Sequence, residues 1–275
     1  MPAPHGGRTL ELAAIREALE FAVEAAQLAG AFTLGYFNTG TPHELKADRS
    51  PVTAADRGSE ELLRRRIARA FPDDGVLGEE FGETPGRSPG RWILDPIDGT
   101  FSFISGVPLY SVLVAYEWAG ELVAGVIHMP ALHETVWAGR GLGVWWNGRR
   151  ARVSEANDLA EARVLSCGSK MFGTGDKKSG FDRLVRACRA DRSWCDAYAY
   201  ALLATGRAEV VLDLSLSLWD TAALYPVVTE AGGTFTDWSG HTTPHTSEVI
   251  ATNGKLLPAV LAELRAGKPG THDLF

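Results

Sequence analysis

The sequence predicts a mixed α/β fold of the α+β kind, and three observations lead to that prediction. Apolar residues recur at spacings of three and four near the start of the chain, as on one face of a helix. A block of short alternating strands follows, and the last third switches between helix and strand patterns. A chain of 275 residues with 45% hydrophobic residues is long enough to bury a large core.

Two helices are expected before the strand block. The first covers about residues 9–37, where an apolar stripe begins at Leu12. The second begins at Thr53, and Asp56 three positions later completes a capping box with Asp in place of Glu. Phe71, which precedes a proline, ends this helix because the residue before proline is driven out of the helical region.

The strand block is predicted to be an antiparallel meander. Short turns join its strands, and the pairs Ala119-Gly120 and Asn147-Gly148 are suited to tight hairpins. The strands are expected at residues 91–95, 110–118, 121–129, 133–138 and 143–153.

After this block the chain alternates between helix and strand, so two domains are predicted, at residues 1–155 and 156–275. A Gly/Lys-rich stretch at residues 172–180 reads as a surface loop. Helices are expected at residues 181–190, 198–205, 220–231 and 254–266, and strands at 163–167, 208–214, 234–237 and 248–252.

Composition and charge disfavour several classes of protein. A net charge of −7 disfavours nucleic acid as a partner. No stretch of 18 residues is free of charged and polar groups, so no membrane span is expected. The three cysteines form no Cys-x-x-Cys pair, which argues against a disulfide framework and favours a reducing, cytoplasmic location.

The stretch from Trp92 to Thr100, WILDPIDGT, carries the clearest chemical signal. Asp95 and Asp98 follow an apolar strand, and Pro96 and Gly99 shape the turn between and after them. Such a turn can direct two carboxylates at one point, and oxygen ligands in that arrangement suit Mg²⁺. A polar turn without a metal is the alternative reading.

Four more acids are candidates for the same site. Glu79 and Glu80 precede the strand, Asp220 follows Trp219 at a helix start, and Asp56 lies in a first helical turn. Each also has a purely structural reading. The two glutamates could be solvated loop charges, and the two aspartates could complement a helix dipole.

With these motifs in place, the sequence resembles the inositol monophosphatase family of metal-dependent phosphomonoesterases. The matching segments keep the family's order along nearly the whole chain. They are SPVTAADR at 50–57, GEE at 78–80, WILDPIDGT at 92–100, WDTAALYPVVTEAGG at 219–233 and ATN at 251–253.

The resemblance implies a layered α-β-α-β-α sandwich of the inositol monophosphatase and fructose-bisphosphatase type, which binds two or three Mg²⁺ ions. It implies hydrolysis of a small phosphorylated metabolite by direct attack of water, in a homodimer. The implied metal ligands are the side chains of Glu79, Asp95, Asp98 and Asp220 and the carbonyl of Ile97, and Asp56 supports a further, weaker metal position. Thr100 and Glu79 orient the water, and the amides of Gly99 and Thr100 receive the phosphate.

The substrate is predicted from a departure within the family. Residues 195–200 read CDAYAY, which is similar to the histidinol-phosphate phosphatase branch. Asp196 could pair with the ammonium group of that substrate, or it could cap the helix that follows. Asp213 takes a position where the family usually has a Glu that contacts the leaving group of the substrate. A second departure is Phe101-Ser102, where Thr-Asn is usual.

Other functions remain open at this point. myo-Inositol 1-phosphate is the second substrate, and a bisphosphate sugar or nucleotide is less favoured because no extra basic residues are visible for a second phosphate. A non-catalytic binding protein is a different class, and it predicts the loss of a metal ligand.

Overall fold

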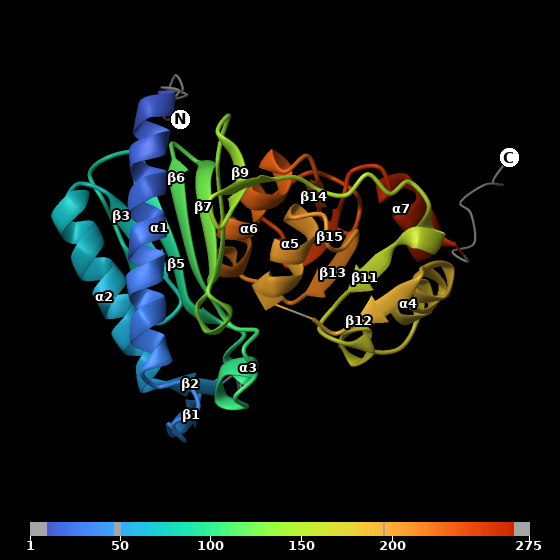
Figure 1. Ribbon diagram of the computed structural model, residues 1–275, viewed down its shortest axis with the longest axis horizontal. Helices are drawn as coiled ribbons and strands as arrows, with labels where there is room; N and C mark the ends of the chain where they lie inside the picture. The colour runs from blue at the N-terminus through green and yellow to red at the C-terminus, as the bar shows by residue number, and fades with distance from the viewer. Residues whose placement is uncertain (1–9, 47–50, 195, 267–275) are drawn as a thin grey trace, which may run out of the picture.

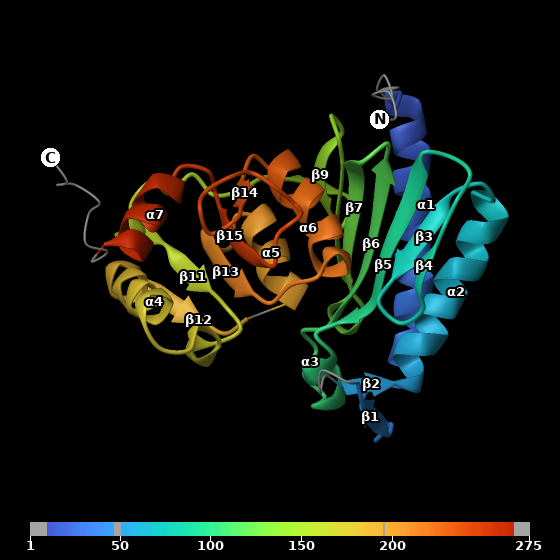
Figure 2. The same ribbon diagram turned by 180° about the vertical axis from the view of Figure 1, so that it is seen from behind.

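The computed structural model describes residues 10–46, 51–194 and 196–266. Helices and sheets alternate in five layers, which confirms the predicted sandwich (Figure 1). Helices α1 and α2 cover the outer face of a large sheet, and α5 and α6 separate it from a smaller sheet. Helices α4 and α7 close the far end, as the view from behind also shows (Figure 2).

The first layer consists of the two predicted helices, α1 (Leu12–Leu34) and α2 (Ala54–Ala70). The capping box that the sequence predicts is present. The Asp56 carboxylate accepts the backbone N–H of Thr53 at 2.7 Å, and the Thr53 hydroxyl accepts the N–H of Ala55 at 3.0 Å. A small two-stranded ribbon, which the sequence did not indicate, precedes α2 and consists of β1 (His43–Leu45) and β2 (Pro51–Thr53).

The large sheet has the order β10-β9-β8-β7-β6-β5-β3-β4 among the described residues. The predicted hairpins are confirmed, and their turn residues Ala119 and Asn147 have positive φ values of 52° and 46°. The prediction of a purely antiparallel sheet is wrong at one edge, because the unpredicted β3 runs parallel to β5. The strands are β3 (Gly75–Gly78), β4 (Gly82–Thr84), β5 (Gly90–Asp98), β6 (Ser111–Trp118), β7 (Glu121–Met129), β8 (Glu134–Gly139), β9 (Gly143–Trp146) and β10 (Arg149–Ala151).

The smaller sheet has the order β12-β11-β13-β15-β14 within the described ranges. The predicted loop at 172–180 is too long, because α4 already begins at Asp176, where Lys178 pairs with Asp182 one turn later at 2.6 Å. The elements are β11 (Arg163–Leu165), α4 (Asp176–Ala187), β12 (Ala190–Arg192), α5 (Asp196–Ala204), β13 (Val210–Leu214), α6 (Leu218–Glu230), β14 (Thr234–Thr236), β15 (Glu248–Thr252) and α7 (Leu257–Arg265). Short 3₁₀ turns occupy Pro130–Leu132, Leu159–Glu161 and Ser169–Phe172.

The two halves of the chain share a hydrophobic core. One cluster of buried side chains joins Ile93 and Leu113 of the large sheet to Tyr200 and Leu203 of α5 and to Val227 of α6. Because this core contains side chains from the large sheet and from the helices of the second half, the two halves pack against each other through it. The predicted division at residue 155 stays a prediction. Within the described ranges, no helix is long and apolar enough to cross a membrane.

Candidate active site

The site is built at the carboxyl end of β5, the strand that contains residues 92–98 of the WILDPIDGT motif. The pairing of β5 with β6 is regular up to Asp95 and resumes at Asp98, with an irregularity between them. The N–H of Ile97 donates to Oδ1 of Asp95 at 3.0 Å inside this irregular turn. A bulge of this kind redirects side chains, so that both carboxylates can face the same point.

The third carboxylate comes from the second half of the chain. Asp220 lies in the first turn of α6, and its Oδ2 accepts the N–H of Ser217 at 2.6 Å. One carboxylate oxygen each from Asp95, Asp98 and Asp220 lies within 4.8 Å of the others. The fold therefore brings together three predicted metal ligands from two parts of the chain, and Asp220 is also a helix-capping residue.

These carboxylates are buried and oppose one another's ionisation. Burial, followed by the charges of Glu79, Asp98 and Asp220, raises the pKa of Asp95 well above its usual range. Burial and the charges of Asp196 and Asp220 do the same to the pKa of Asp98. Burial raises the pKa of Asp220 to about 6. A group of acids that oppose one another's ionisation is stabilised by a bound cation.

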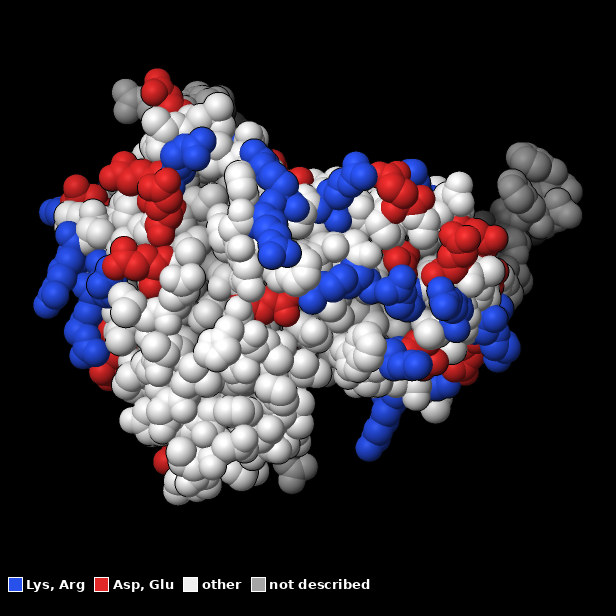
Figure 3. Space-filling view, viewed as in Figure 1, with Lys and Arg blue, Asp and Glu red and all other residues white. Residues whose placement is uncertain are grey.

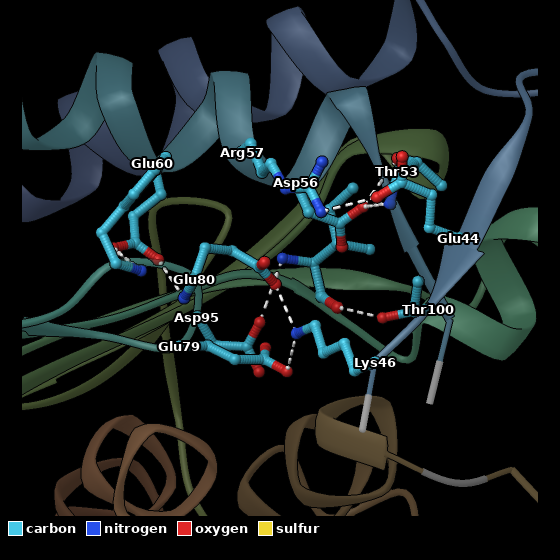
Figure 4. Close-up of polar contacts among 12 residues, drawn as sticks. Glu44, Lys46, Thr53, Asp56, Arg57, Glu60, Glu79, Glu80, Asp95 and Thr100 are labelled. Atoms are coloured by element: carbon cyan, nitrogen blue, oxygen red, sulfur yellow. Dashed lines mark hydrogen bonds and ion pairs between the residues drawn. The ribbon is translucent and has the colours of Figure 1, made fainter. Parts of the chain in front are cut away.

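Glu79 and Glu80 follow β3 and are joined by a lysine (Figure 4). Nζ of Lys46 lies 2.7 Å from Oε1 of Glu79 and 2.5 Å from Oε1 of Glu80. Although burial opposes the charge of Lys46, its hydrogen bonds to the two glutamates outweigh burial and raise its pKa. The side chain of Glu80 is only 4% exposed, so the alternative reading of a solvated loop charge is wrong for this residue.

Asp56 lies close to this group but is not one of the three converging acids. Its Oδ2 accepts both the N–H and the hydroxyl of Thr53, at 2.7 and 2.6 Å. Burial raises the pKa of Asp56, and the charge of Glu79 adds to that rise. The structural reading of this residue as a capping residue is therefore confirmed, whereas its predicted role near a further metal remains a prediction.

Gly99 and Thr100 begin the short helix α3 (Thr100–Ile104) directly after β5. Gly99 has a φ of 81°, in the left-handed region that glycine adopts without strain. A Cβ atom at this position would lie 2.8 Å from Oδ2 of Asp196, so the backbone also needs glycine for a close approach. The hydroxyl of Thr100 donates to the carbonyl of Ile97 at 3.1 Å, which leaves its oxygen able to accept a hydrogen bond.

Asp98 connects the two halves of the site. Its Oδ2 accepts the N–H of Ala197 at the start of α5 at 2.7 Å and the hydroxyl of Ser111 at 3.0 Å. These two donors hold the carboxylate in one orientation. Sequence reasoning missed Ser111 and Lys46, because a serine at a strand start and a lysine in a polar segment are ordinary features.

A cavity of about 700 Å³ extends from this cluster into the second half of the chain. Asp213, at the end of β13, and Asp196, at the start of α5, both line it. Burial, followed by the charge of Asp196, raises the pKa of Asp213 to about 7. The other lining residues are Asp98, Phe101, Cys167, Met171, Ala197, Tyr200, Leu214, Ser215, Leu216, Asp220 and Leu224.

The residues of this site fit a hard divalent cation. The three converging groups offer oxygen ligands alone, and that donor set suits Mg²⁺, Ca²⁺ or Mn²⁺ rather than zinc or copper. Glu79 lies beside Asp95 and supplies a further carboxylate (Figure 4). The carbonyl of Ile97 lies in the same turn, between Asp95 and Asp98. An acidic cluster of this composition can bind a metal and can place it next to the cavity.

Comparisons with known proteins agree with this geometry. The sequence model of the inositol monophosphatase family matches residues 14–268. The chain is 44% identical to a histidinol-phosphatase of Chlorobaculum parvum over 81% of this chain and 86% of that protein. It is 39% identical to a fructose-1,6-bisphosphatase/inositol-1-monophosphatase of Thermotoga maritima over 69% of this chain and 72% of that protein. The crystal structure of the extragenic suppressor protein suhB from Bartonella henselae superposes with a TM-score of 0.87 at 30% identity, over 92% of this chain and 100% of that one.

Proposed function

Since the chain belongs to the inositol monophosphatase family and is a phosphoric monoester hydrolase, we propose that it hydrolyses L-histidinol phosphate to L-histidinol and phosphate with Mg²⁺. Membership in this family makes the enzyme metal-dependent. The identity of the ion as Mg²⁺, with two or three ions per site, is part of the proposal. A place in histidine biosynthesis follows from the proposed substrate.

The residues that would hold the ions are those that converge at the end of β5. We assign Asp95, Asp98 and Asp220 as ligands because their oxygens lie within 4.8 Å of one another. Glu79 and the carbonyl of Ile97 complete the proposed set, and Asp56 would support a weaker position nearby. When bound, the ions supply charge neutralisation for the phosphate and a lowered pKa for the attacking water.

The chain itself positions the water and the phosphate. The Thr100 hydroxyl donates a hydrogen bond to the carbonyl of Ile97, so its oxygen can accept a hydrogen bond from a water molecule. The carboxylate of Glu79 would accept a second hydrogen bond from the same water, which directs its oxygen toward phosphorus. The amides of Gly99 and Thr100, at the turn into α3, would bind a phosphate oxygen. Asp98 keeps its orientation throughout, because Ser111 and Ala197 hold it.

The acidic wall of the cavity is the observation that supports histidinol phosphate most strongly. Asp196 and Asp213 line the cavity beside the proposed metal ligands, and both come from the second half of the chain. In histidinol phosphate the ammonium group sits one carbon away from the phosphorylated carbon, so it would reach this wall when the phosphate lies at the metals. A cation there stabilises the ionised form of Asp213, which burial otherwise opposes.

Phe101 gives the cavity an aromatic side. It follows Thr100 directly, is 72% exposed, and lines the cavity together with the two acids. An exposed aromatic ring beside carboxylates suits an imidazole or imidazolium group, which can stack on the ring. A cyclitol offers only hydroxyl groups and gains less from either feature. We therefore assign Phe101, Asp196 and Asp213 to recognition of the leaving group.

The test is a comparison of kcat/KM for histidinol phosphate and myo-inositol 1-phosphate, measured as phosphate release with Mg²⁺. We expect a ratio above about 100 in favour of histidinol phosphate, which corresponds to about 2.7 kcal/mol of transition-state discrimination. A ratio near one, or in favour of the inositol ester, would show that the acidic wall does not select the substrate.

A second experiment tests the metal ligands. The variant Asp95→Asn should lose phosphate release by a factor of about 1,000 or more, while its circular dichroism spectrum stays that of the wild type. Turnover that survives this change would contradict the assignment of Asp95 as a metal ligand.

Hydrolysis of myo-inositol 1-phosphate is the alternative function. It is favoured by the Thermotoga maritima relative, whose name includes both fructose-1,6-bisphosphatase and inositol-1-monophosphatase. A bisphosphate substrate is less favoured, because no lysine or arginine is among the residues that line the cavity within the described ranges. The second phosphate of such a substrate would face carboxylates.

We also propose that the enzyme is a cytoplasmic homodimer. Figure 3 shows a wide area without charged side chains on the lower part of the N-terminal half, and interface centres are depleted of charge. Light scattering coupled to size-exclusion chromatography should give twice the mass of 29.6 kDa. A monomer at micromolar concentration would contradict the dimer.

A further inference from the structure

Glu60 is a buried acid that the proposed reaction does not use. It lies on the inner face of α2, and its side chain is 0% exposed. A buried carboxylate is costly unless hydrogen bonds and opposite charge compensate it, so its partners indicate what it is for.

All three partners described for this carboxylate belong to α2 or to the segment that follows β3. Oε2 accepts the N–H of Glu80 at 2.7 Å, and Oε1 accepts the N–H of Phe81 at 3.3 Å. Nε of Arg64, one helical turn along α2, donates to Oε1 at 2.7 Å. Figure 4 shows Glu60 reaching from the helix to the backbone beside Glu80.

The same contact extends to the end of β3. A Cβ atom on Gly78 would lie 2.1 Å from Oε1 of Glu60, so the glycine lets the carboxylate lie directly against the strand. The next amide along the chain, that of Glu79, donates to the carbonyl of Leu94 on β5 at 3.3 Å. The backbone around Glu79 is therefore held on one side by β5 and on the other by Glu60.

Arg64 connects this arrangement to the rest of the sheet. Its guanidinium donates to the hydroxyl of Thr84 at 3.0 Å and to the carbonyl of Gly82 at 2.5 Å, in addition to Glu60. The segment that leaves β3 and the strand β4 that returns are thus both tied to α2 through one ion pair. Such an ion pair fixes a backbone turn more firmly than a neutral hydrogen bond does.

We propose that Glu60 is a positioning residue that fixes the turn at residues 79–81, so that Glu79 faces Asp95, and that it thereby sets the affinity of the site for its cation. This inference rests on the proposed role of Glu79 as a metal ligand. Glu60 itself touches neither the cation nor the substrate. Groups that orient metal ligands typically change metal affinity by 10- to 100-fold when they are removed.

The variant Glu60→Gln tests this inference. The amide is nearly isosteric, but one oxygen becomes an NH₂ group, so that at least one of the three donors faces another donor. We expect the dissociation constant for Mg²⁺, measured by calorimetry without substrate, to rise about tenfold. Amide hydrogen exchange at Glu80 and Phe81 should accelerate, while exchange in β6 and β7 stays unchanged.

Glu61→Gln is the matched control. Glu61 is the next residue of α2, its side chain is 56% exposed, and it pairs only loosely with Arg65 at 3.7 Å. This variant should bind Mg²⁺ within twofold of the wild type. A folded Glu60→Gln variant that binds Mg²⁺ like the wild type, even with a lower melting temperature, would reduce Glu60 to a structural residue and overturn the inference.

Two further results keep the test decisive. If Glu60→Gln does not fold, hydrogen exchange is measured on the wild type, and rapid exchange at the amides of Glu80 and Phe81 would overturn the inference while protection supports it. Glu79→Gln separates the two proposals. If Glu79→Gln binds Mg²⁺ like the wild type, the assignment of Glu79 as a metal ligand fails. If Glu79→Gln loses Mg²⁺ binding and Glu60→Gln does not, only the positioning role of Glu60 is refuted.

Discussion

Replacing Asp213 with asparagine should stabilise the metal-free protein at neutral and alkaline pH much more than at acidic pH. Asp213 is 4% exposed and accepts the N–H of Leu214 at 2.9 Å. Burial, followed by the charge of Asp196, raises its pKa from 3.8 to about 7. Asparagine keeps the shape and can keep the hydrogen bond to Leu214, but it carries no charge.

The magnitude follows from proton linkage. Between pH 3.8 and about 7 the folded protein retains a proton on Asp213 that the unfolded chain releases, so the free energy of unfolding falls as pH rises. The whole rise in pKa corresponds to about 4 kcal/mol at 1.36 kcal/mol per pKa unit. The stability difference between Asp213→Asn and the wild type should therefore grow by about 3 kcal/mol from pH 4.5 to pH 8.

Urea-induced unfolding in the presence of a chelator measures this difference at several pH values. Asp191→Asn is the control, since Asp191 is an exposed residue of β12 in the same sheet. Its effect should stay within about 0.5 kcal/mol at every pH. A stability difference for Asp213→Asn that is constant from pH 4.5 to pH 8 would refute the reasoning.

The same variant has a second expected effect, on catalysis. A hydrogen bond to a charged group contributes about 1.5–3 kcal/mol, so kcat/KM for histidinol phosphate should fall about 10- to 100-fold. The inositol ester carries no ammonium group, and its kcat/KM should change less than about threefold. Equal losses for both esters would contradict cation recognition by Asp213 and would leave the pH argument intact.

Three more predictions concern the backbone, the helix cap and the metal. Gly99→Ala should lower phosphate release more than tenfold and lower the free energy of unfolding by about 1–3 kcal/mol. Gly120→Ala is the control: Gly120 has a similar φ of 86°, and a Cβ atom there would have no neighbour within 4 Å, so activity should stay unchanged. Equal activity in both variants would contradict close packing of Asp196 on Gly99. Thr53→Ala should lower the urea-unfolding free energy by about 1 kcal/mol through loss of the capping box, and an unchanged midpoint would contradict that role. Chelation with EDTA should abolish phosphate release and excess Mg²⁺ should restore it; activity that persists in EDTA would contradict the metal requirement.

Local features of the sequence were sufficient for much of the fold. The helix α2 is predictable because its capping box needs only Thr53 and Asp56, three residues apart. The hairpin between β6 and β7 is predictable because Ala119 and Gly120 form a two-residue turn between two apolar runs. The motif at the end of β5 likewise indicates converging carboxylates within a few residues. In each case the interacting groups are neighbours in the chain, so their pattern is visible without tertiary structure.

Tertiary structure decided what depends on distant partners. Strand β3 is short and shows no alternation, and only its parallel pairing with β5 makes it a strand that delivers Glu79 to the site. In the first turn of α4, Lys177 pairs with Glu248 of β15, which lies 71 positions later in the chain. Spacing along the sequence cannot reveal such contacts, because they arise where separate layers pack against each other.

The site itself divides in the same way. The sequence, through its family resemblance, predicts Asp95, Asp98 and Asp220 as metal ligands together with Glu79 and the carbonyl of Ile97. The structure brings one carboxylate oxygen of each of the three aspartates within 4.8 Å of the others. The pairing of Lys46 with Glu79 and the support of the turn by Glu60 came from the structure alone. Motifs identify residues that perform chemistry, whereas the residues that orient them are chosen by burial and by contacts between elements, which only the folded chain defines.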